Sequence, residues 1–357
     1  MKSGRALVLG SGPAGLAFAR LLLARGWQVD LRSDPPRRTP VVVTLNDLTC
    51  QLLRELFGVD AAALPGAHAL AGRCVRWDDG EAMLHPLPSA ALPLASLSAA
   101  LASGAMDAGL RFRPAETIDP QRYDWVVDAA GRHGGDAVQV LRFGSRAAVA
   151  ARVRLAAKAP SDCCTMEAVA GGWVFLIPVG GGNAVLQAMS AMPFADAAER
   201  LGELLEASAL LRPWVAAVDA QVDRLEAMPR LRARPAVAGR IAIGDAALAL
   251  DPLSGDGIGC GLRSAILAAA VVDAIRAGED AQACTLHYAR RLQRAALSHV
   301  RSCIDHYRRA EPGRAWRGEI DAMSSALLHC GEDAERFAFR LDRAGLVRSR
   351  APPVAAS

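Results

Sequence analysis

Lysine is almost missing from this chain of 357 residues. Of its 41 basic residues only Lys2 and Lys158 are lysines, and all the others are arginines. The scarcity restricts any chemistry that needs a lysine amine, because arginine keeps its proton and does not form the corresponding adducts. With 37 acidic residues interspersed among the basic ones, the net charge is only +4, so no basic surface predicts nucleic-acid binding.

A metal-binding pattern is also missing. The eight cysteines, at positions 50, 74, 163, 164, 260, 284, 303 and 330, include no CxxC pair, and the seven histidines form no cluster with them. We therefore expect no metal site. Reduced thiols in a cytoplasmic protein are the expected state of these cysteines.

Long apolar runs are absent as well. The run that follows Met1 and Lys2 is interrupted by glycines, and no small-residue cleavage site follows it, which argues against a signal peptide. No apolar segment is expected to approach the roughly 20 residues that a membrane span needs. The composition, 52% hydrophobic and 22% charged, predicts a soluble globular protein, which we place in the cytoplasm.

The first residues predict a βαβ unit. A strand over 6–9 is followed by glycines, a helix over 13–25 and a second strand over 28–31. Gly10, Gly12 and Gly15 form a GxGxxG pattern that encloses Pro13 and Ala14. In such a pattern the first glycine permits a tight turn, the second lets a pyrophosphate approach, and the third lets helix and strand pack closely. The pattern predicts a dinucleotide at the start of the helix, where unpaired N–H groups favour phosphate.

The acid that normally closes the second strand of a dinucleotide site is missing here. Its expected position is Ser33, which lies between Arg32 and Asp34. An arginine near this position can bind the 2′-phosphate of NADP. At this point the residues leave two alternatives open, NADP or a different dinucleotide with a weaker contact to its ribose.

Further along the chain, the patterns predict an insertion rich in β-strands. Helices are expected over 46–57 and 94–108, a strand over 124–131, short strands from 137 to 192, a helical stretch over 195–219 and an Arg-rich helical tail over 281–345. We predict a nucleotide-binding domain in two parts, 1–135 and 235–280. A β-rich substrate domain over 136–234 separates them, and C-terminal helices occupy 281–357.

A second glycine-rich segment, IAIGDAALALDPLSGDGIGCGL, covers residues 241–262. A strand ends at Gly244 and Asp245, and a loop with Pro252, Gly255 and Gly257 leads into a helix. Clustered glycines let backbone N–H groups lie against a flat ligand with polar edges, and the helix start offers its positive dipole end to negative charge.

Three separated motifs carry a resemblance to a known family. The GxGxxG turn, DWVVDAAGR at 124–132 and GDAALALDPLSGDGI at 244–258 together resemble glutathione-reductase-type FAD enzymes of the p-hydroxybenzoate hydroxylase fold. The resemblance implies an α/β fold with a Rossmann-like FAD-binding domain, an inserted β-sheet substrate domain and a helical C-terminal tail. It implies that FAD is the cofactor, with Asp245 on the ribityl chain and residues from Pro252 to Ile258 along the isoalloxazine ring. Ser33 and Asp34 would contact the adenosine ribose only weakly, so we expect FAD to be held loosely.

A fourth motif indicates which branch of this family the chain resembles. Trp173, Phe175 and Ile177, followed by a proline, resemble a degenerate form of the Trp-x-Trp-x-Ile-Pro motif of tryptophan-halogenase-like enzymes. The same alternation is typical of an ordinary half-buried strand, and both interpretations hold if that strand forms a pocket wall. Trp173 and Phe175 are therefore the predicted substrate-pocket residues. The segment resembling the one that supplies a halogenase's reactive lysine contains Arg73 and no lysine, so halogenation is disfavoured.

The resemblance implies an FAD-dependent monooxygenase. Its substrate would be an electron-rich aromatic compound or a peptide-borne tryptophan, hydroxylated through a flavin C4a-hydroperoxide, as in maturation flavoproteins of quinone cofactors. The usual Asp-Gly of NAD(P)H-using hydroxylases is replaced by Ala129 and Ala130, so a separate flavin reductase is a candidate partner. Two alternatives remain: a reductase of the geranylgeranyl-reductase type, and a flavoprotein that assists assembly of a partner protein. No catalytic acid or base is identified, and neither nucleic acid nor a membrane is expected as a partner.

Overall fold

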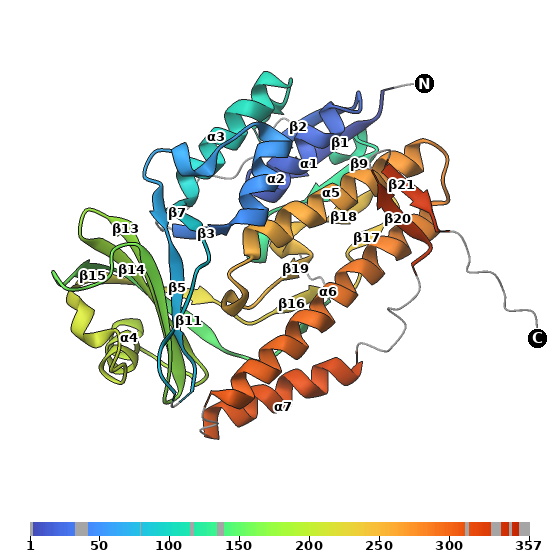
Figure 1. Cartoon of the computed structure of the whole chain (residues 1–357). Helices are drawn as coiled ribbons and strands as arrows, with labels where there is room; N and C mark the ends of the chain where they lie inside the picture. The colour runs from blue at the N-terminus through green and yellow to red at the C-terminus, as the bar shows by residue number, and fades with distance from the viewer. Residues whose placement is uncertain are drawn as a thin grey trace, which may run out of the picture.

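Two large sheets lie on opposite sides of the molecule, with the C-terminal helices along one edge (Figure 1). The computed structural model describes residues 3–32, 42–78, 80–114, 118–133, 139–310, 314–329, 337–342 and 345–349. Ser33 and Asp34, predicted to contact the ribose, lie outside these ranges, as does part of the strand expected to begin at 137.

The first sheet carries the predicted βαβ unit. Among the described residues it has the order β17 (Ala236–Val237), β18 (Arg240–Ala242), β9 (Trp125–Asp128), β1 (Arg5–Leu9), β2 (Gln28–Arg32) and β8 (Arg111–Phe112). All neighbouring strands are parallel except β17 and β18, which are antiparallel. The first part of the chain and the segment after residue 235 therefore meet in one sheet, as the discontinuous arrangement requires.

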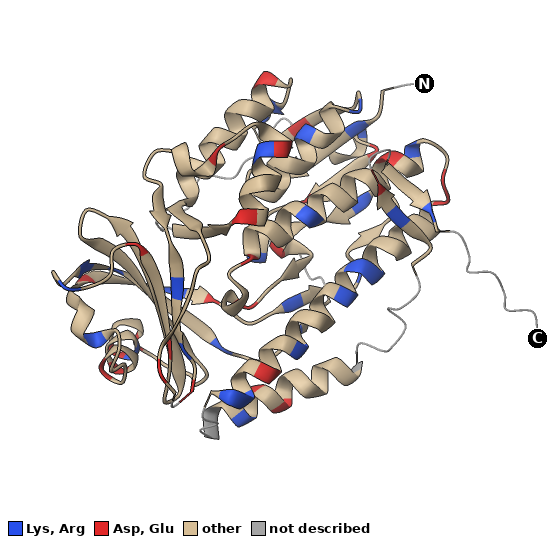
Figure 2. Cartoon of the chain, in the orientation of Figure 1, with Lys and Arg blue, Asp and Glu red and all other residues tan. Residues whose placement is uncertain are grey.

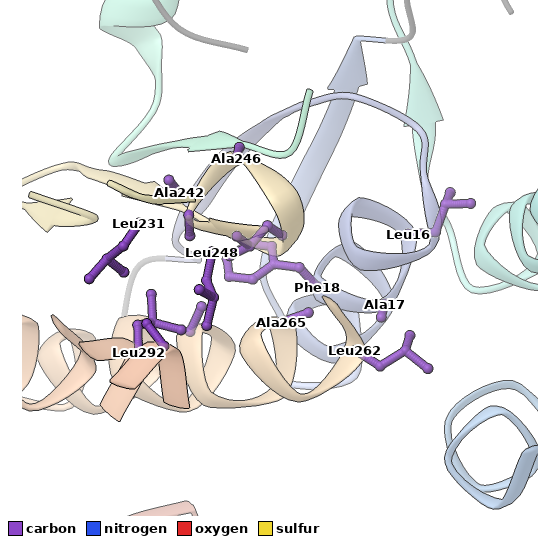
Figure 3. Close-up of a cluster of buried hydrophobic side chains, with 14 of the residues drawn as sticks. Leu16, Ala17, Phe18, Leu231, Ala242, Ala246, Leu248, Leu262, Ala265 and Leu292 are labelled. Atoms are coloured by element: carbon purple, nitrogen blue, oxygen red, sulfur yellow. The ribbon is translucent and has the colours of Figure 1, made fainter. Parts of the chain in front are cut away.

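Helices α1 (Pro13–Leu23) and α5 (Gly257–Arg276) pack together against this sheet. Phe18 points from α1 toward Leu248 and Ala265 in a fully apolar cluster (Figure 3). By length and composition α5 could cross a membrane, so the expectation that no apolar segment reaches this length is wrong. In its most apolar 18-residue stretch, 61% of the helix is buried inside the protein. Such burial is typical of a core helix in a soluble protein.

The second sheet is the predicted β-rich insertion, with an addition. In the described part its order is β15 (Val215–Glu226), β11 (Ala147–Leu155), β14 (Asn183–Ser190), β13 (Gly172–Gly180), β12 (Cys163–Val169), β5 (Gly72–Arg76) and β6 (Met83–His85). Strands β5 and β6 come from within the 1–135 segment but pair here, through β12. The proposed boundaries between domains remain predictions.

Strand β13 is buried on both faces. Trp173, Phe175 and Ile177 belong to the main core, while Val174 and Leu176 belong to a second core under α4 (Ala197–Glu206). The strand therefore lies between two cores, with alternate side chains in each. It is buried on both faces, not half-buried as the alternation predicted.

Smaller elements connect the two sheets. One small sheet joins β3 (Val42–Asn46), β7 (Ser89–Pro93) and β4 (His68–Leu70), and another joins β10 (Val140–Arg142), β16 (Arg230–Arg232) and β19 (Leu248–Ala249). The remaining helices are α2 (Asp47–Phe57), α3 (Leu94–Asp107), α6 (Ala281–Arg309) and α7 (Arg314–His329), with short 3-10 turns at 61–63, 120–122, 131–133, 212–214, 244–246 and 252–254.

Two predicted helical stretches are only partly helical. The stretch over 195–219 is helical as α4, and then enters strand β15, because this segment pairs along β11. The tail over 281–345 is helical through α7 but ends in the hairpin β20 (Phe339–Asp342) and β21 (Gly345–Arg348). Basic positions recur along α6 and one acidic residue, Asp305, lies near its end, the mixed pattern of a solvated helix face (Figure 2).

Candidate active site

The two glycine-rich segments line one cavity. It has a volume of about 370 Å³ and is bounded by the turn before α1, by β3, by the end of β9, by the loop before α5 and by the inner face of β13 and β14. Its lining residues are Gly12, Pro13, Ala14, Val42, Val43, Thr44, Leu94, Ala129, Gly131, Phe175, Ile177, Gln187, Ile243, Gly244, Asp245, Pro252, Gly255, Gly257, Ile258 and Gly261. Segments far apart in the sequence thus meet between the two sheets.

The three glycines of the first motif occupy three different environments. Gly10 has φ +116°, and a Cβ there would overlap the Ala129 carbonyl oxygen. A Cβ on Gly15 would overlap the carbonyl oxygen of Gly10. Only Gly12 faces open space, with no atom within 4 Å of the place its Cβ would occupy. Gly10 and Gly15 therefore shape the turn from behind, and Gly12 leaves room for a ligand.

Two helix N-termini open into this cavity. Helix α1 starts after Gly12 and α5 starts after Asp256, and neither first turn receives a side-chain cap or contains an acidic residue. The first N–H groups of both helices are consequently free to bind a ligand, and both dipoles favour negative charge there. Two uncapped helix N-termini on one cavity suit a ligand that has phosphate groups in one part and a ring that accepts electrons in another.

Asp245 lies on the cavity wall, held by an arginine. Its carboxylate is 3.5 Å from Nε of Arg132, whose other nitrogens donate to the carbonyl oxygens of Met228 and Leu250. Desolvation raises the pKa of Asp245, and the guanidinium groups of Arg132 and Arg230 partly oppose this rise. With 41% of its side chain open to the cavity, Asp245 can still accept hydrogen bonds from a ligand.

The acidic residue of strand β2 is engaged elsewhere. Asp30 is buried and accepts hydrogen bonds from Tyr123 at 2.7 Å and from Arg111 at 3.0 Å. Burial alone would raise the pKa of Asp30, but the Tyr123 hydroxyl and the charges of Arg111 and Arg113 outweigh it and lower the pKa. Asp30 thus stabilises the sheet edge and does not replace the missing ribose acid.

The opposite wall of the cavity is aromatic and aliphatic. Phe175 and Ile177 of β13 line it, together with Gln187 of β14, which is the ladder partner of Phe175. Trp173, the other predicted pocket residue, lies outside the lining. It is 1% exposed, and its indole N–H donates to the Tyr307 hydroxyl at 3.3 Å. Gly10 and Gly15 also lie behind the cavity surface rather than on it.

A buried charged network under the loop escaped sequence analysis. Asp251, at the start of the 3-10 turn over 252–254, accepts from Arg146 at 2.6 Å and from Tyr307 at 2.9 Å, and its backbone N–H donates to His299 Nε2. Arg146 also donates to Glu319 of α7. Burial lowers the pKa of His299, which favours the neutral ring that this acceptor role needs. In the sequence, the only feature that points to this network is the aspartate before Pro252.

Neither lysine chemistry nor metal chemistry is indicated at the site. The cavity lining contains no lysine, and Lys158 is exposed in the connection between β11 and β12. Among the described residues, no group of His, Cys, Asp or Glu could hold a metal ion, and the seven cysteines described there are all free thiols.

The architecture is that of FAD-dependent oxygenases and halogenases, which confirms the predicted fold and its resemblance. The solved structure of the peptidyl tryptophan dihydroxylase QhpG, essential for tryptophylquinone cofactor biogenesis, matches with a TM-score of 0.79 and 22% identity over 97% of this chain and 86% of that one. The myxobacterial chondrochloren halogenase CndH matches with a TM-score of 0.77 and 18% identity, over 89% and 86%. The oxygenase MHPCO, which acts on 2-methyl-3-hydroxypyridine-5-carboxylic acid, matches with 0.64 and 18%, over 91% and 98%. No protein-family model and no curated protein matches the sequence.

Proposed function

We propose that this chain is an FAD-dependent monooxygenase that hydroxylates an electron-rich aromatic substrate. The observation that carries the proposal is the single cavity onto which the starts of α1 and α5 open, with Phe175 and Ile177 as the facing wall. When bound, FAD supplies the activation of O₂ that hydroxylation needs. The protein contributes the binding, the orientation and the exclusion of water.

The residues present fit FAD. Gly12 and Gly257 each leave open space where a Cβ would lie, and each stands at an uncapped helix start on the cavity. Gly12, Pro13 and Ala14 would hold the pyrophosphate, and Asp245 would hold the ribityl chain. The residues Pro252, Gly255, Gly257 and Ile258 would lie along the isoalloxazine ring.

The wall of β13 favours an aromatic substrate. Phe175 and Ile177 offer an apolar face to a ring, and the lysine-free lining favours hydroxylation over halogenation. QhpG is a peptidyl tryptophan dihydroxylase, and its structural match covers 97% of this chain. We therefore extend the proposed substrate class to a tryptophan within a peptide.

The proposal includes a reductase partner and a cytoplasmic location. Ala129 and Gly131 line the cavity at the position where direct NAD(P)H users have a different motif, so a separate flavin reductase is the proposed electron donor. The free thiols of the seven described cysteines are the state expected of a reducing compartment.

The test is oxygen uptake by the FAD-loaded protein. NADH, NADPH or an added flavin reductase supplies electrons, and a panel of indoles, phenols and tryptophan-containing peptides is analysed for products heavier by one oxygen atom. The proposal predicts that at least one compound gains oxygen in proportion to the O₂ consumed. Release of all reducing equivalents as free peroxide with every compound would contradict it, and anaerobic reduction of an isoprenoid double bond would favour the reductase alternative.

A further inference from the structure

Two polar side chains beside Phe175 have no hydrogen-bond or ion-pair partner among the described residues. Arg73 of β5 places its guanidinium carbon 5.4 Å from the centre of the Phe175 ring. Gln187 of β14 stands opposite Phe175 in the β13–β14 ladder and lines the cavity. Within the part of the chain that the structure describes, neither side chain makes a hydrogen bond or an ion pair.

The Arg73 guanidinium also lies against the second glycine segment. A Cβ on Gly255 would be 3.1 Å from one of its terminal nitrogens. Gly255 and Phe175 both line the cavity, so the guanidinium, which is not itself in the lining, lies at its edge between the proposed cofactor loop and the aromatic wall. Arg73 pairs with Cys164 across the β5–β12 ladder, and Cys164 belongs to the same core cluster as Phe175, so the two side chains share one face of the sheet.

The surroundings leave these donors open to a ligand. Around Phe175 this face of the sheet carries the apolar residues Met166, Ile177 and Val185, while His85 stands opposite Arg73 in the β5–β6 ladder and Arg152 stands opposite Val185 in the β11–β14 ladder. The guanidinium offers five N–H donors and the amide offers two more, and both side chains are half-buried with polar atoms that a ligand's acceptor can reach. Gln187 stands on β14, next to β13, and Arg73 stands on β5, two strands from β13 on its other side. The two groups therefore flank Phe175 and suit an acceptor attached to a ring that lies on it.

We propose that Arg73 and Gln187 together bind an oxygen acceptor of the substrate, a carboxylate or an amide carbonyl, and so orient its aromatic ring over Phe175. The inference rests on the proposed function, because it assumes that the substrate ring enters the same cavity. A guanidinium fork can bind a carboxylate or carbonyl oxygen in a fixed geometry, and this fixes which ring carbon points toward the cofactor loop.

Calorimetric binding without any reductant tests the inference. Indole-3-acetate, indole-3-acetamide and 3-methylindole share one ring and differ in the oxygen acceptor. We expect indole-3-acetate or indole-3-acetamide to bind the FAD-loaded wild type about tenfold more tightly than 3-methylindole, since only these two can accept charge-assisted hydrogen bonds from the guanidinium. A preference for the acetate indicates a free acid as the natural substrate, and equal binding of acetate and acetamide indicates a peptide-like carbonyl.

Substitutions of Arg73 and Gln187 test whether these side chains cause the preference for a ligand with an oxygen acceptor. Arg73→Met should reduce the preference to within about twofold, while Arg73→Lys keeps part of it, because lysine retains the charge but not the fork. Gln187→Leu should lower it less. Arg240→Met, an exposed arginine on β18, is the matched control and should leave binding unchanged. Thermal unfolding checks the fold, and Arg73→Met should keep a Tm close to that of the wild type because it loses only a cation–π contact.

The outcomes separate this inference from the proposed function. Absence of binding by all three compounds, equal binding of all three by the wild type, or an unchanged preference in Arg73→Met would overturn the inference. If hydroxylation of other substrates persists in that event, the proposed function stands. If the preference behaves as expected but no compound is ever oxygenated, only the proposed function fails.

Discussion

Arg146 and Asp251 form an ion pair 2.6 Å long in which both side chains are fully buried. Arg146 immediately precedes β11 in the second sheet, and Asp251 begins the loop that carries Pro252 and Gly255 to the cavity. The pair therefore fastens the proposed cofactor loop to the sheet that forms the opposite wall. Tyr307 of α6 and Glu319 of α7 complete the arrangement.

Removal of the Arg146 charge should destabilise the whole fold. Arg146→Met leaves the carboxylates of Asp251 and Glu319 buried without their cation, and we expect a loss of about 3–5 kcal/mol in the free energy of unfolding. Urea denaturation measures it. Arg212→Met breaks the exposed pair with Glu206 and serves as the control, with an expected change below about 1 kcal/mol. Similar losses in the two variants would contradict the structural role of the buried pair.

The same substitution at two glycines of one motif should have opposite effects. Gly12→Ala places a Cβ in open space, and Gly12 has an ordinary extended conformation with φ −72°. We expect unchanged stability and FAD affinity lowered by at least about tenfold, or 1.4 kcal/mol. Gly15→Ala drives a Cβ into the Gly10 carbonyl, so it should lower stability by about 1–3 kcal/mol. Thermal unfolding and flavin-fluorescence titration distinguish these outcomes. Retention of normal FAD affinity by Gly12→Ala would place the pyrophosphate elsewhere.

The ionised carboxylate of Asp245 should strengthen FAD binding and lower the stability of the FAD-free protein. The pKa of Asp245 is higher in the folded protein than its unfolded value of 3.8. Its contribution to stability is therefore fully present below pH 3.8 and is lost as the pH rises through the folded-state pKa. Asp245→Asn should therefore raise the Tm of the FAD-free protein at pH 7, and the gain should disappear as the pH falls below about 4. The same variant should bind FAD about 10- to 100-fold more weakly. Arg132 keeps its bonds to Met228 and Leu250, so the wall itself should remain.

Tyr123 should control part of the acid sensitivity of the fold. The lowered pKa of Asp30 gives stability that is present above its unfolded value of 3.8 and is lost as pH falls through the folded-state pKa. Tyr123→Phe removes the hydroxyl donor and keeps the ring beneath Arg5. We expect about 1 kcal/mol less stability at pH 7 and a smaller loss between about pH 5 and pH 2. Parallel pH curves for wild type and variant would contradict this assignment.

Retention of FAD should improve when an acid is restored after β2. Asp30 is committed to Arg111 and Tyr123, so its carboxylate is not available to the ribose. The wild type should lose part of its FAD on dialysis, and Ser33→Glu should retain more of it, because a carboxylate binds both ribose hydroxyls. The absorbance ratio of flavin to protein after dialysis measures this. Stoichiometric FAD in the dialysed wild type would contradict the prediction for Ser33.

Local patterns predicted those parts of the molecule that local chemistry determines. The strand, glycine turn and helix over residues 5–23 could be predicted because the three glycine roles depend on neighbours within a few residues and on one adjacent strand. The alternation in β13 likewise appeared in the sequence. These features need no knowledge of the rest of the chain.

Long-range pairing decided what the patterns missed. The segment after Leu211 has apolar spacing that suits a helix or a strand, and its pairing with β11 selects the strand β15. The network around Asp251 draws single residues from the start of β11, from α6 and from α7, and each is unremarkable among its sequence neighbours. Only the folded chain places them around one carboxylate.

The position of α7 has a consequence for the order of assembly during synthesis. The loop that follows Asp251 leaves the ribosome well before Trp316, which stacks on Tyr307 at 4.0 Å, and before Glu319, which completes the partners of Arg146. While those helices are still emerging, Asp251 and Arg146 can meet only in a partly solvated setting. The cofactor loop therefore gains its final support only after α7 has been synthesised, and the nascent chain should acquire full affinity for FAD only once α7 has docked.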